Sequence, residues 1–191
     1  MWSIIPGKEI FSLRDFLKLA GDESLVSKEL SRFECKLDSE TETFLRKKAI
    51  PFEKAHKSRT YLVVKEELVR GRHLTILAYF SVALSITEIQ GTVSRTKRKE
   101  LDGMFDNKNV PCYLIGQLAK NHKFKGEIDG RELVDYAMNM FRVGHELVGG
   151  RFVRVDCKKN DCVVRFYENN GFHRLQENED GLLEFTRFLA D

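Results

Sequence analysis

The last third of the chain, from residue 110 to residue 172, constrains the fold more than any other segment. Residues 113–119 form an apolar run that predicts a buried strand, and residues 130–147 have the apolar spacing of an amphipathic helix. A second strand is predicted over residues 152–156 and a second helix over residues 160–169. Because helices that alternate with strands pack against a sheet, this order predicts an α/β (α+β) layout.

A loop with two glycines joins the first of these strands to the first helix. It runs from Lys123 to Arg131 and contains Gly126 and Gly130. Backbone N–H groups at a helix N-terminus converge on one point, and the helix dipole favours an anion there. The glycines and the flanking cations therefore indicate a seat for a diphosphate, although this pattern alone is common.

The rest of the chain is predicted to alternate between helices and strands around a central mixed sheet with helices on both faces. Gly21 ends a helix predicted over residues 10–20, and Pro51 breaks or kinks a helical region predicted over residues 37–57 whose cap signal is residues 39–42. Residues 60–64 and 74–86 are predicted to pair as a hairpin, and a final strand pair is predicted around residues 172–175 and 182–189. Residues 89–109 are polar and basic, with four cations between Arg95 and Lys99.

Composition excludes several classes of protein. With 191 residues, 42% of them hydrophobic, the chain can bury the core of one compact domain. We expect no signal peptide and no membrane contact, because the start lacks a basic and apolar leader and residues 74–86 are too short to span a bilayer. A cytoplasmic location is therefore expected. The net charge of +3 does not by itself indicate nucleic acid.

Cysteine and histidine give no sign of a metal site. The four cysteines lack the spacing of a disulfide framework or a zinc site and are interpreted as small apolar residues. The five histidines have no metal-ligand spacing either, so no metal is predicted.

The second helix carries a motif that resembles the GNAT superfamily of acyl-CoA N-acyltransferases. The motif consists of Asn160 followed by Phe166-Tyr167-Glu168 and Gly171-Phe172, and the preceding residues 154–157 are similar to the family's fifth strand and its closing Asp. Gly126 and Gly130 fit the family's phosphate loop, Arg/Gln-x-x-Gly-x-Gly/Ala. Lys125, Ile128 and Asp129 depart from that pattern.

A narrower resemblance, over residues 33–188, is to the acetyltransferase toxins of bacterial toxin–antitoxin pairs. It is carried by Phe33-Glu34-Cys35, by residues 58–63 and by residues 110–119. Lys36 and Gln117 depart from the toxin pattern, which usually has Gly and Arg there. The resemblance implies one catalytic domain over residues 1–191, with a core at residues 33–188 and an N-terminal helical extension at residues 1–32.

These resemblances imply a splayed GNAT-type sheet and an acetyl-CoA-dependent N-acetyltransferase in which a primary amine attacks the thioester directly. The partners that they imply are an amine acceptor, tRNA, a small antitoxin protein and a second copy in a homodimer. On this interpretation the run from Arg95 to Lys99 contacts tRNA phosphates without reading sequence. The alternative is that the run is a solvated linker.

The resemblance also assigns roles to residues. The backbone of Gln117, Leu118 and Ala119 is expected to bind the pantetheine and the thioester carbonyl. The diphosphate is expected over the loop formed by Lys123, Lys125, Gly126, Glu127, Ile128, Asp129, Gly130 and Arg131. Two carboxylates and a bulky Ile in this loop are expected to weaken CoA binding unless both carboxylates point outward. Asn160 is expected to cap its helix, to contact the pantetheine amide, or to do both.

Tyr167 is the predicted general acid for the departing thiolate. A phenol has a pKa of about 10 and is protonated at neutral pH, which suits a thiolate of comparable basicity. The alternative is that Tyr167 packs against the sheet and forms one hydrogen bond. No residue stands out as a general base, and Glu88 is a candidate by position only.

Three functions are therefore compatible with the sequence. The first is acetylation of a primary amine, with the amino group of an aminoacyl-tRNA as the sharpest candidate. The second is acetylation of a small-molecule or protein amine. The third is a degenerate CoA-binding or partner-binding module without catalysis, which the atypical residues Ile128 and Asp129 favour and an intact Tyr167 opposes.

Overall fold

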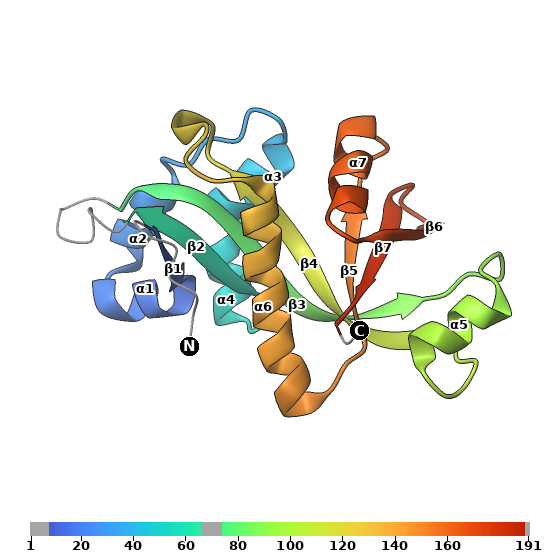
Figure 1. The fold of residues 1–191 in the computed structure, drawn as a ribbon. Coiled ribbons are helices and arrows are strands. Elements are labelled where there is room, and N and C mark those ends of the chain that lie inside the picture. The colour runs from blue at the N-terminus through green and yellow to red at the C-terminus, as the bar shows by residue number, and fades with distance from the viewer. Residues whose placement is uncertain (1–7, 66–73, 190–191) are drawn as a thin grey trace. The chain divides into compact units, whose positions relative to one another are not determined.

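The computed structural model describes residues 8–65 and 74–189. Figure 1 shows its strands and helices in chain order. The strands are β1 (Lys8–Ser12), β2 (Arg59–Lys65), β3 (Ile76–Glu88), β4 (Asn109–Lys120), β5 (Phe152–Cys157), β6 (His173–Glu177) and β7 (Leu183–Phe188). The helices are α1 (Leu13–Ala20), α2 (Glu23–Leu30), α3 (Ser39–Thr43), the π-helix η1 (Phe44–Lys48), α4 (Ala49–Lys54), α5 (Arg95–Asp102), the 3₁₀ helix η3 (His122–Phe124), α6 (Gly130–Val148) and α7 (Asp161–Asn169).

The chain folds into two compact units. Unit 1 comprises residues 1–82 and 117–133, and unit 2 comprises residues 83–116 and 134–191. The strands β3 and β4 and the helix α6 contribute residues to both units. The hydrogen-bonded order β1-β2-β3-β4-β5-β7-β6 gives a seven-stranded mixed sheet, which confirms the predicted α/β class.

In unit 1, the strand order is β1-β2-β3-β4, and β2 is antiparallel to both β1 and β3. β1 pairs with β2 from Lys8↔Lys65 to Ser12↔Tyr61. The core lies where α1, α2 and α4 meet this sheet, and its fully buried side chains include Leu30, Phe33, Leu45, Leu62 and Tyr79. Burial of this apolar surface is the main stabilising contribution to the unit.

In unit 2, the order is β3-β4-β5-β7-β6. β4 and β5 are parallel and pair from Tyr113↔Val153 to Ile115↔Val155, whereas β5 and β7 are antiparallel from Phe152↔Phe188 to Cys157↔Leu183. Figure 1 shows α7 beside β5 and β7, and α5 between the ends of β3 and β4. The ring of Tyr113 in β4 packs against Phe141 of α6 with ring centroids 5.1 Å apart.

The N-terminal segment differs from the prediction. Residues 8–12 form the edge strand β1, so the helix predicted from residue 10 begins at Leu13. Ser12 caps α1 by accepting a hydrogen bond from the Asp15 N–H, and Gly21 ends it in the left-handed region with φ +65°. Ile10 and Phe11 fit the helical spacing, but pairing with β2 outweighs this local pattern. The first 32 residues therefore hold a strand as well as helices.

The helical region around residue 45 also differs in detail. Asp38, and not the predicted residues 39–42, caps it by accepting from the Glu40 N–H. Over η1 the backbone adopts the wider hydrogen-bond spacing of a π-helix, and α4 then begins at Ala49. Pro51 lies inside this continuous helical run from residue 39 to residue 54, shortly after the π-helix, so the predicted break does not occur.

The predicted linker over residues 89–109 contains the helix α5, which the sequence analysis missed. Ser94 caps α5 by accepting from the Lys97 N–H, and Gly103 ends it with φ +89°. Leu101 is the one buried residue of α5, and the other residues of the helix are polar or charged. The segment therefore has no apolar periodicity from which a helix could be predicted.

Candidate functional site

The predicted phosphate loop lies in unit 1 and is tied to β3 by Asn121. The Asn121 amide donates to the Ile76 carbonyl at 2.8 Å, and its oxygen accepts from the Lys123 N–H at 3.1 Å. The loop turns at Gly126, whose φ of +86° favours glycine. The first helical residue of α6 is Gly130, as predicted.

The N-terminus of α6 is capped by two carboxylates of the protein itself. Asp129 Oδ1 accepts from the Arg131 N–H at 3.0 Å, and Glu132 Oε2 accepts from the Asp129 N–H at 2.9 Å. Glu132 reaches back to the N-cap residue as in a capping box, although Asp129 accepts from the second helical N–H and not the third. Lys8 Nζ lies 2.8 Å from Glu132 Oε1 and balances one of the two charges. Asp129 therefore places a negative charge at the end of the helix where a diphosphate is predicted.

Two backbone donors at this helix end are left for a ligand. Within residues 8–65 and 74–189, the N–H groups of Gly130 and Glu132 have no hydrogen-bond acceptor. The Leu133 N–H donates to the Asp129 carbonyl at 3.3 Å.

The predicted phosphate-binding side chains have different environments. Lys123 Nζ is held by Glu34 at 2.8 Å and by the Arg32 carbonyl at 3.2 Å. Glu127 is paired with Lys65 at 2.8 Å, so its charge is compensated. The side chain of Ile128 is 3% exposed and belongs to the interior.

Lys125 and Arg131 are the loop cations that stay available. Both are exposed, and neither has an ion-pair partner within the described part of the chain. Gln117 and Leu118 at the end of β4 are half-buried, and Ala119 packs into the unit 1 core.

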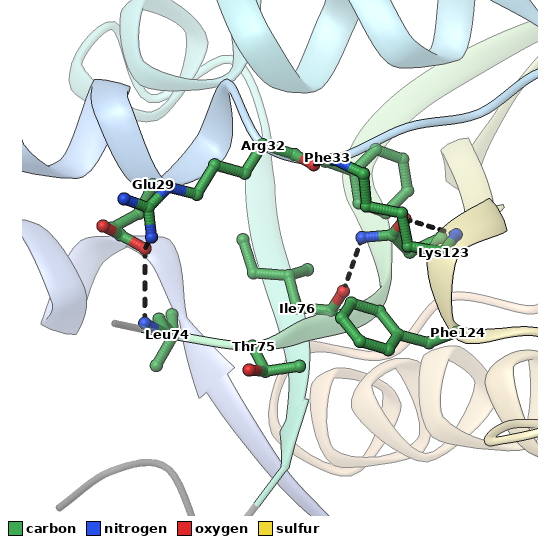
Figure 2. A pocket seen from close by; sticks show the side chains of 9 residues that line it. Glu29, Arg32, Phe33, Leu74, Thr75, Ile76, Lys123 and Phe124 are labelled. Atoms are coloured by element: carbon green, nitrogen blue, oxygen red, sulfur yellow. Dashed lines mark hydrogen bonds and ion pairs between the residues drawn. The ribbon is translucent and has the colours of Figure 1, made fainter. Parts of the chain in front are cut away.

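Unit 1 also has a cavity of about 230 Å³ that the sequence analysis missed. Figure 2 shows its walls: Glu29 accepts from the Leu74 N–H at 3.3 Å and pairs with Arg32, while Phe33 and Phe124 lie on the opposite side. The full lining is Glu29, Arg32, Phe33, Leu74, Thr75, Ile76, Asn121, Lys123 and Phe124. These residues come from three separate segments of the chain, so no local sequence motif predicts the cavity.

In unit 2, Asn160 caps α7. Its Oδ1 accepts from the N–H groups of Cys162 at 2.9 Å and Val163 at 3.4 Å. The capping role that the sequence predicted is therefore present.

Tyr167 lies in the last turn of α7 inside an aromatic cluster. Its ring centroid is 5.1 Å from that of Phe166, 5.6 Å from Phe172 and 6.4 Å from Phe185. The side chain is buried, and its hydroxyl has no hydrogen-bond partner among the described residues. Burial raises the pKa of Tyr167 above its usual value, and the nearby charges of Cys157 and Asp156 raise it further. The phenol therefore keeps its proton throughout the neutral range.

A polar cluster occupies one face of β5 and β7 in unit 2. Arg154 contacts two carboxylates: its Nε lies 3.0 Å from Asp156 Oδ1 and its Nη1 lies 3.6 Å from Glu184 Oε1. Gln176 Nε2 donates to Glu184 at 2.7 Å. Burial raises the pKa of both Asp156 and Glu184, although Arg154 opposes the shift. Glu88, by contrast, is an exposed side chain at the end of β3.

The basic run lies on α5, where acidic neighbours pair most of it. Arg95 and Arg98 both contact Asp106, at 3.3 and 2.7 Å. Lys97 pairs with Glu100 at 3.1 Å and lies 5.0 Å from the ring centre of Phe188. Lys99 is exposed and has no partner among the described residues.

The part of the chain that the structure describes contains neither a candidate membrane span nor a candidate metal cluster. No helix there is both long and apolar enough to cross a bilayer. No group of three or more His, Cys, Asp or Glu side chains there is arranged to hold a metal ion.

Comparison with solved structures identifies the fold. A crystal structure of a tyrosine-to-phenylalanine mutant of KacT matches with a TM-score of 0.71 and 21% identity, covering 94% of this chain and 95% of that chain. AtaT complexed with acetyl-methionyl-tRNAfMet matches with a TM-score of 0.70 and 24% identity, covering 93% of this chain and 94% of that chain. The chain has the fold of these toxins.

A third structure, of AtaTR bound with acetyl-CoA, matches with a TM-score of 0.66 and 21% identity and covers 95% of this chain and 94% of that chain. No protein-family model matches the sequence, and a search of curated proteins gave no match. The predicted resemblance to the toxins of toxin–antitoxin pairs is therefore confirmed at the level of the fold.

Proposed function

We propose that this protein is an acetyl-CoA-dependent N-acetyltransferase whose acceptor is a primary amine, first of all the amino group of an aminoacyl-tRNA. The observation that carries the proposal is Tyr167, a buried and protonated phenol in the last turn of the helix that Asn160 caps. The fold of AtaT, which has been captured with acetyl-CoA and with acetyl-methionyl-tRNAfMet, supports the choice of donor and acceptor.

The reaction needs no covalent enzyme intermediate. The neutral amine attacks the thioester carbonyl, a C–N bond forms, and the C–S bond then breaks. Backbone N–H groups of residues 117–119 are the proposed donors to the developing oxyanion. Tyr167 donates its proton to the departing thiolate and regains one from the nitrogen, which loses a proton as the amide forms. Asn160 contributes by holding α7 in place and, in this proposal, by contacting the pantetheine.

The proposed diphosphate seat consists of the N–H groups of Gly130 and Glu132 together with the side chains of Lys125 and Arg131. Asp129 opposes an anion there, because its carboxylate already occupies the positive end of α6. Acetyl-CoA is therefore expected to bind more weakly than to a loop without this carboxylate.

The experiment that tests the proposal is calorimetric titration with acetyl-CoA, followed by an acceptor screen that includes charged tRNAs, polyamines and protein amines. Saturable binding and acetylation of an amine by the wild type, with loss of turnover in Tyr167→Phe, would support the proposal. Acetylation of a small-molecule or protein amine, but not of charged tRNA, would contradict the proposed acceptor and support the proposed reaction.

One observation favours the alternative of a non-catalytic module. The helix end that would bind the diphosphate is capped by the carboxylates of Asp129 and Glu132 within the protein itself. If the wild type gives no heat with acetyl-CoA at millimolar concentration, the alternative is correct and the enzyme assignment fails.

An antitoxin and a tRNA are the macromolecular partners that we propose from the likeness to AtaT, which has been solved with the C-terminus of the antitoxin AtaR and with acetyl-methionyl-tRNAfMet. For tRNA, the side chains of Lys99 and Arg95 on α5 are the exposed cations of the basic run. Because Arg95 and Arg98 are paired with Asp106, we expect α5 to add only a modest part of the phosphate contacts.

A further inference from the structure

The polar cluster of unit 2 contains more negative than positive charge. Asp156 and Glu184 face the same guanidinium, Arg154. Among the described residues no second cation contacts either carboxylate. With both carboxylates ionised, the cluster therefore carries one uncompensated negative charge.

The donors of Arg154 are also divided among neutral acceptors. Nη1 donates to the Ile86 carbonyl at 3.1 Å and to Thr87 Oγ1 at 3.3 Å. Nη2 is divided between Ser85 Oγ at 3.4 Å and Asp156 Oδ2 at 3.3 Å, which is a long bond for a charged pair. The guanidinium is thus shared between β3 and the carboxylates of β5 and β7, and it cannot satisfy both carboxylates with short, aligned bonds.

Two buried oxygen atoms of the cluster lack partners. Asp156 Oδ1 has no aligned hydrogen-bond donor although Arg154 Nε is near, and the hydroxyl of Thr186 has no partner among the described residues. Thr186 is 1% exposed and pairs in register with Arg154, so it lies on the same face of the sheet as the carboxylates. Arg154 Nε, 3.0 Å from Asp156 Oδ1, is likewise without an aligned partner, so the guanidinium and this carboxylate oxygen are close but poorly aligned. A buried polar group without a partner costs free energy, so Asp156 Oδ1 and the Thr186 hydroxyl are acceptors that a further donor would satisfy.

Asp156 is the accessible member of the carboxylate pair. Its side chain is 22% exposed, whereas that of Glu184 is 6% exposed. Asp156 also lies close enough to Tyr167 for its charge to affect the phenol. A cation that approaches the cluster from solvent therefore meets Asp156 first.

We propose that Asp156, with Glu184 behind it and Arg154 beside it, binds the ammonium group of the acceptor and accepts a proton from it. This inference rests on the proposed function for the identity of the ligand. It also supplies the general base that no sequence motif identified.

The proton balance of this step is simple. An N–H bond of the ammonium breaks, an O–H bond forms on Asp156, and the product is a neutral amine that can attack a thioester. Asp156 then returns the proton to water. An α-amino group has a pKa of about 7.7–8.0. The groups around Asp156 act in opposite directions: burial raises its pKa, which brings it closer to that of the amine, and Arg154 limits the rise.

The first experiment measures ammonium binding without catalysis. Methylammonium chloride is titrated into the ¹⁵N-labelled protein, and the Nε–H signal of Arg154 is followed by NMR. Tetramethylammonium, which has the same charge and no N–H donor, is the control ligand. We expect a saturable shift with methylammonium in the wild type, and its loss in Asp156→Asn, which leaves Arg154 neutralised by Glu184.

Asp180→Asn is the matched control variant, because Asp180 is an exposed carboxylate in the turn between β6 and β7. It should keep the wild-type response. Should Asp156→Asn fail to fold, Glu184→Gln removes the same charge and is measured in its place. The absence of a saturable shift in the wild type, or an unchanged shift in both cluster variants, would overturn the proposal.

The second experiment separates this proposal from the proposed function. With an amine that the acceptor screen identifies, Asp156→Asn should raise the amine KM about tenfold or more, since a contact to a charged group is lost. The acetyl-CoA Kd should be unchanged. An unchanged amine KM would overturn the role of Asp156 while acetyl transfer stands. If acetyl-CoA does not bind at all, the proposed function fails and the methylammonium titration alone decides whether the cluster binds ammonium.

Discussion

At the scale of single residues, the proposed site combines Tyr167 as the proposed general acid, Asn160 as the cap of its helix, and Asp156 as the proposed ammonium-binding carboxylate. Asn160 and Tyr167 belong to one helix, so their spacing fixes their positions relative to each other. The cluster around Asp156 depends on its pairing with Glu184 across β5 and β7, 28 residues further along the chain. No local pattern encodes that pairing.

The first residue-scale prediction concerns Tyr167→Phe. The ring and its aromatic contacts are kept, and no hydrogen bond within the described part of the chain is lost, so stability and acetyl-CoA affinity should change little. Turnover should fall by ~10²–10⁴-fold, the usual contribution of general acid catalysis.

The matched control is Tyr113→Phe, another buried tyrosine of unit 2, whose hydroxyl donates to the Gly149 carbonyl. This change should lower the free energy of unfolding by about 1 kcal/mol and leave turnover intact. Wild-type turnover in Tyr167→Phe would mean that the thiolate leaves unassisted or takes its proton from elsewhere.

The second residue-scale prediction is that Asp129→Asn tightens acetyl-CoA binding. Asn is as good a helix cap as Asp, so α6 keeps its N-terminus while the negative charge at the diphosphate seat disappears. A charge at a helix end is worth about 0.3–1 kcal/mol, so the Kd measured by calorimetry should fall about two- to fivefold.

The double change Ile128→Gly with Asp129→Ile restores the family's loop pattern but is a poorer test, because Ile128 is buried and its removal costs stability. Gly130→Glu supplies the opposite control: a third carboxylate at the same helix end, beside Asp129 and Glu132, should abolish binding. Equal affinity of Asp129→Asn and the wild type would place the diphosphate elsewhere.

At the scale of elements, the prediction failed where long-range pairing or capping outweighs periodicity. Ile10 and Phe11 have helical spacing, yet β1 forms because a partner strand is available in β2. The helix α5 has only Leu101 buried, and its ends are set by Ser94 and Gly103, so a search for apolar periodicity overlooks it. The strands β4 and β5 and the helices α6 and α7 were predicted to within a few residues because each has a continuous apolar face or run.

The element-scale prediction addresses the two roles of Asn160. Asn160→Ala removes the acceptor for two N–H groups of α7 and should lower the free energy of unfolding by about 1 kcal/mol, measured by urea denaturation. Asn160→Asp keeps an acceptor oxygen and should retain the wild-type stability. If Asn160 acts only as a cap, acetyl-CoA affinity in Asn160→Asp equals that of the wild type, whereas a loss of affinity indicates that its amide also contacts the ligand.

At the scale of the whole molecule, the chain combines the fold of KacT and AtaT with loop charges of its own, such as that of Asp129. The apolar pattern determines the sheet and its helices, and many sequences share it, which is why the fold matches at 21–24% identity. In our proposal, the acceptor is bound by a few polar side chains, such as those around Asp156, which are not part of this apolar pattern. On that proposal, fold and acceptor are specified by different parts of the sequence.

The pH dependence of stability tests this view of the polar cluster. Burial raises the pKa of Asp156 above its ordinary value of 3.8, so in this group the folded state holds its proton more tightly than the unfolded state does. Stability that comes from the protonated carboxyl is complete below pH 3.8 and is lost as the pH rises through the raised pKa of the folded state. Glu184, whose pKa burial also raises, contributes with the same sign.

Asp156→Asn cannot ionise at this position, so its stability relative to the wild type should increase as the pH rises from about 4 through the raised pKa of the folded state, and should level off above it. Urea denaturation of both proteins across this range measures the difference, and Asp180→Asn is the control that removes an exposed carboxylate. A pH dependence of Asp156→Asn no steeper than that of the control would mean that Asp156 is not penalised by burial. In that case the cluster would have no unmet need for a cation, and the ammonium site inferred from its charge imbalance would lose its energetic basis.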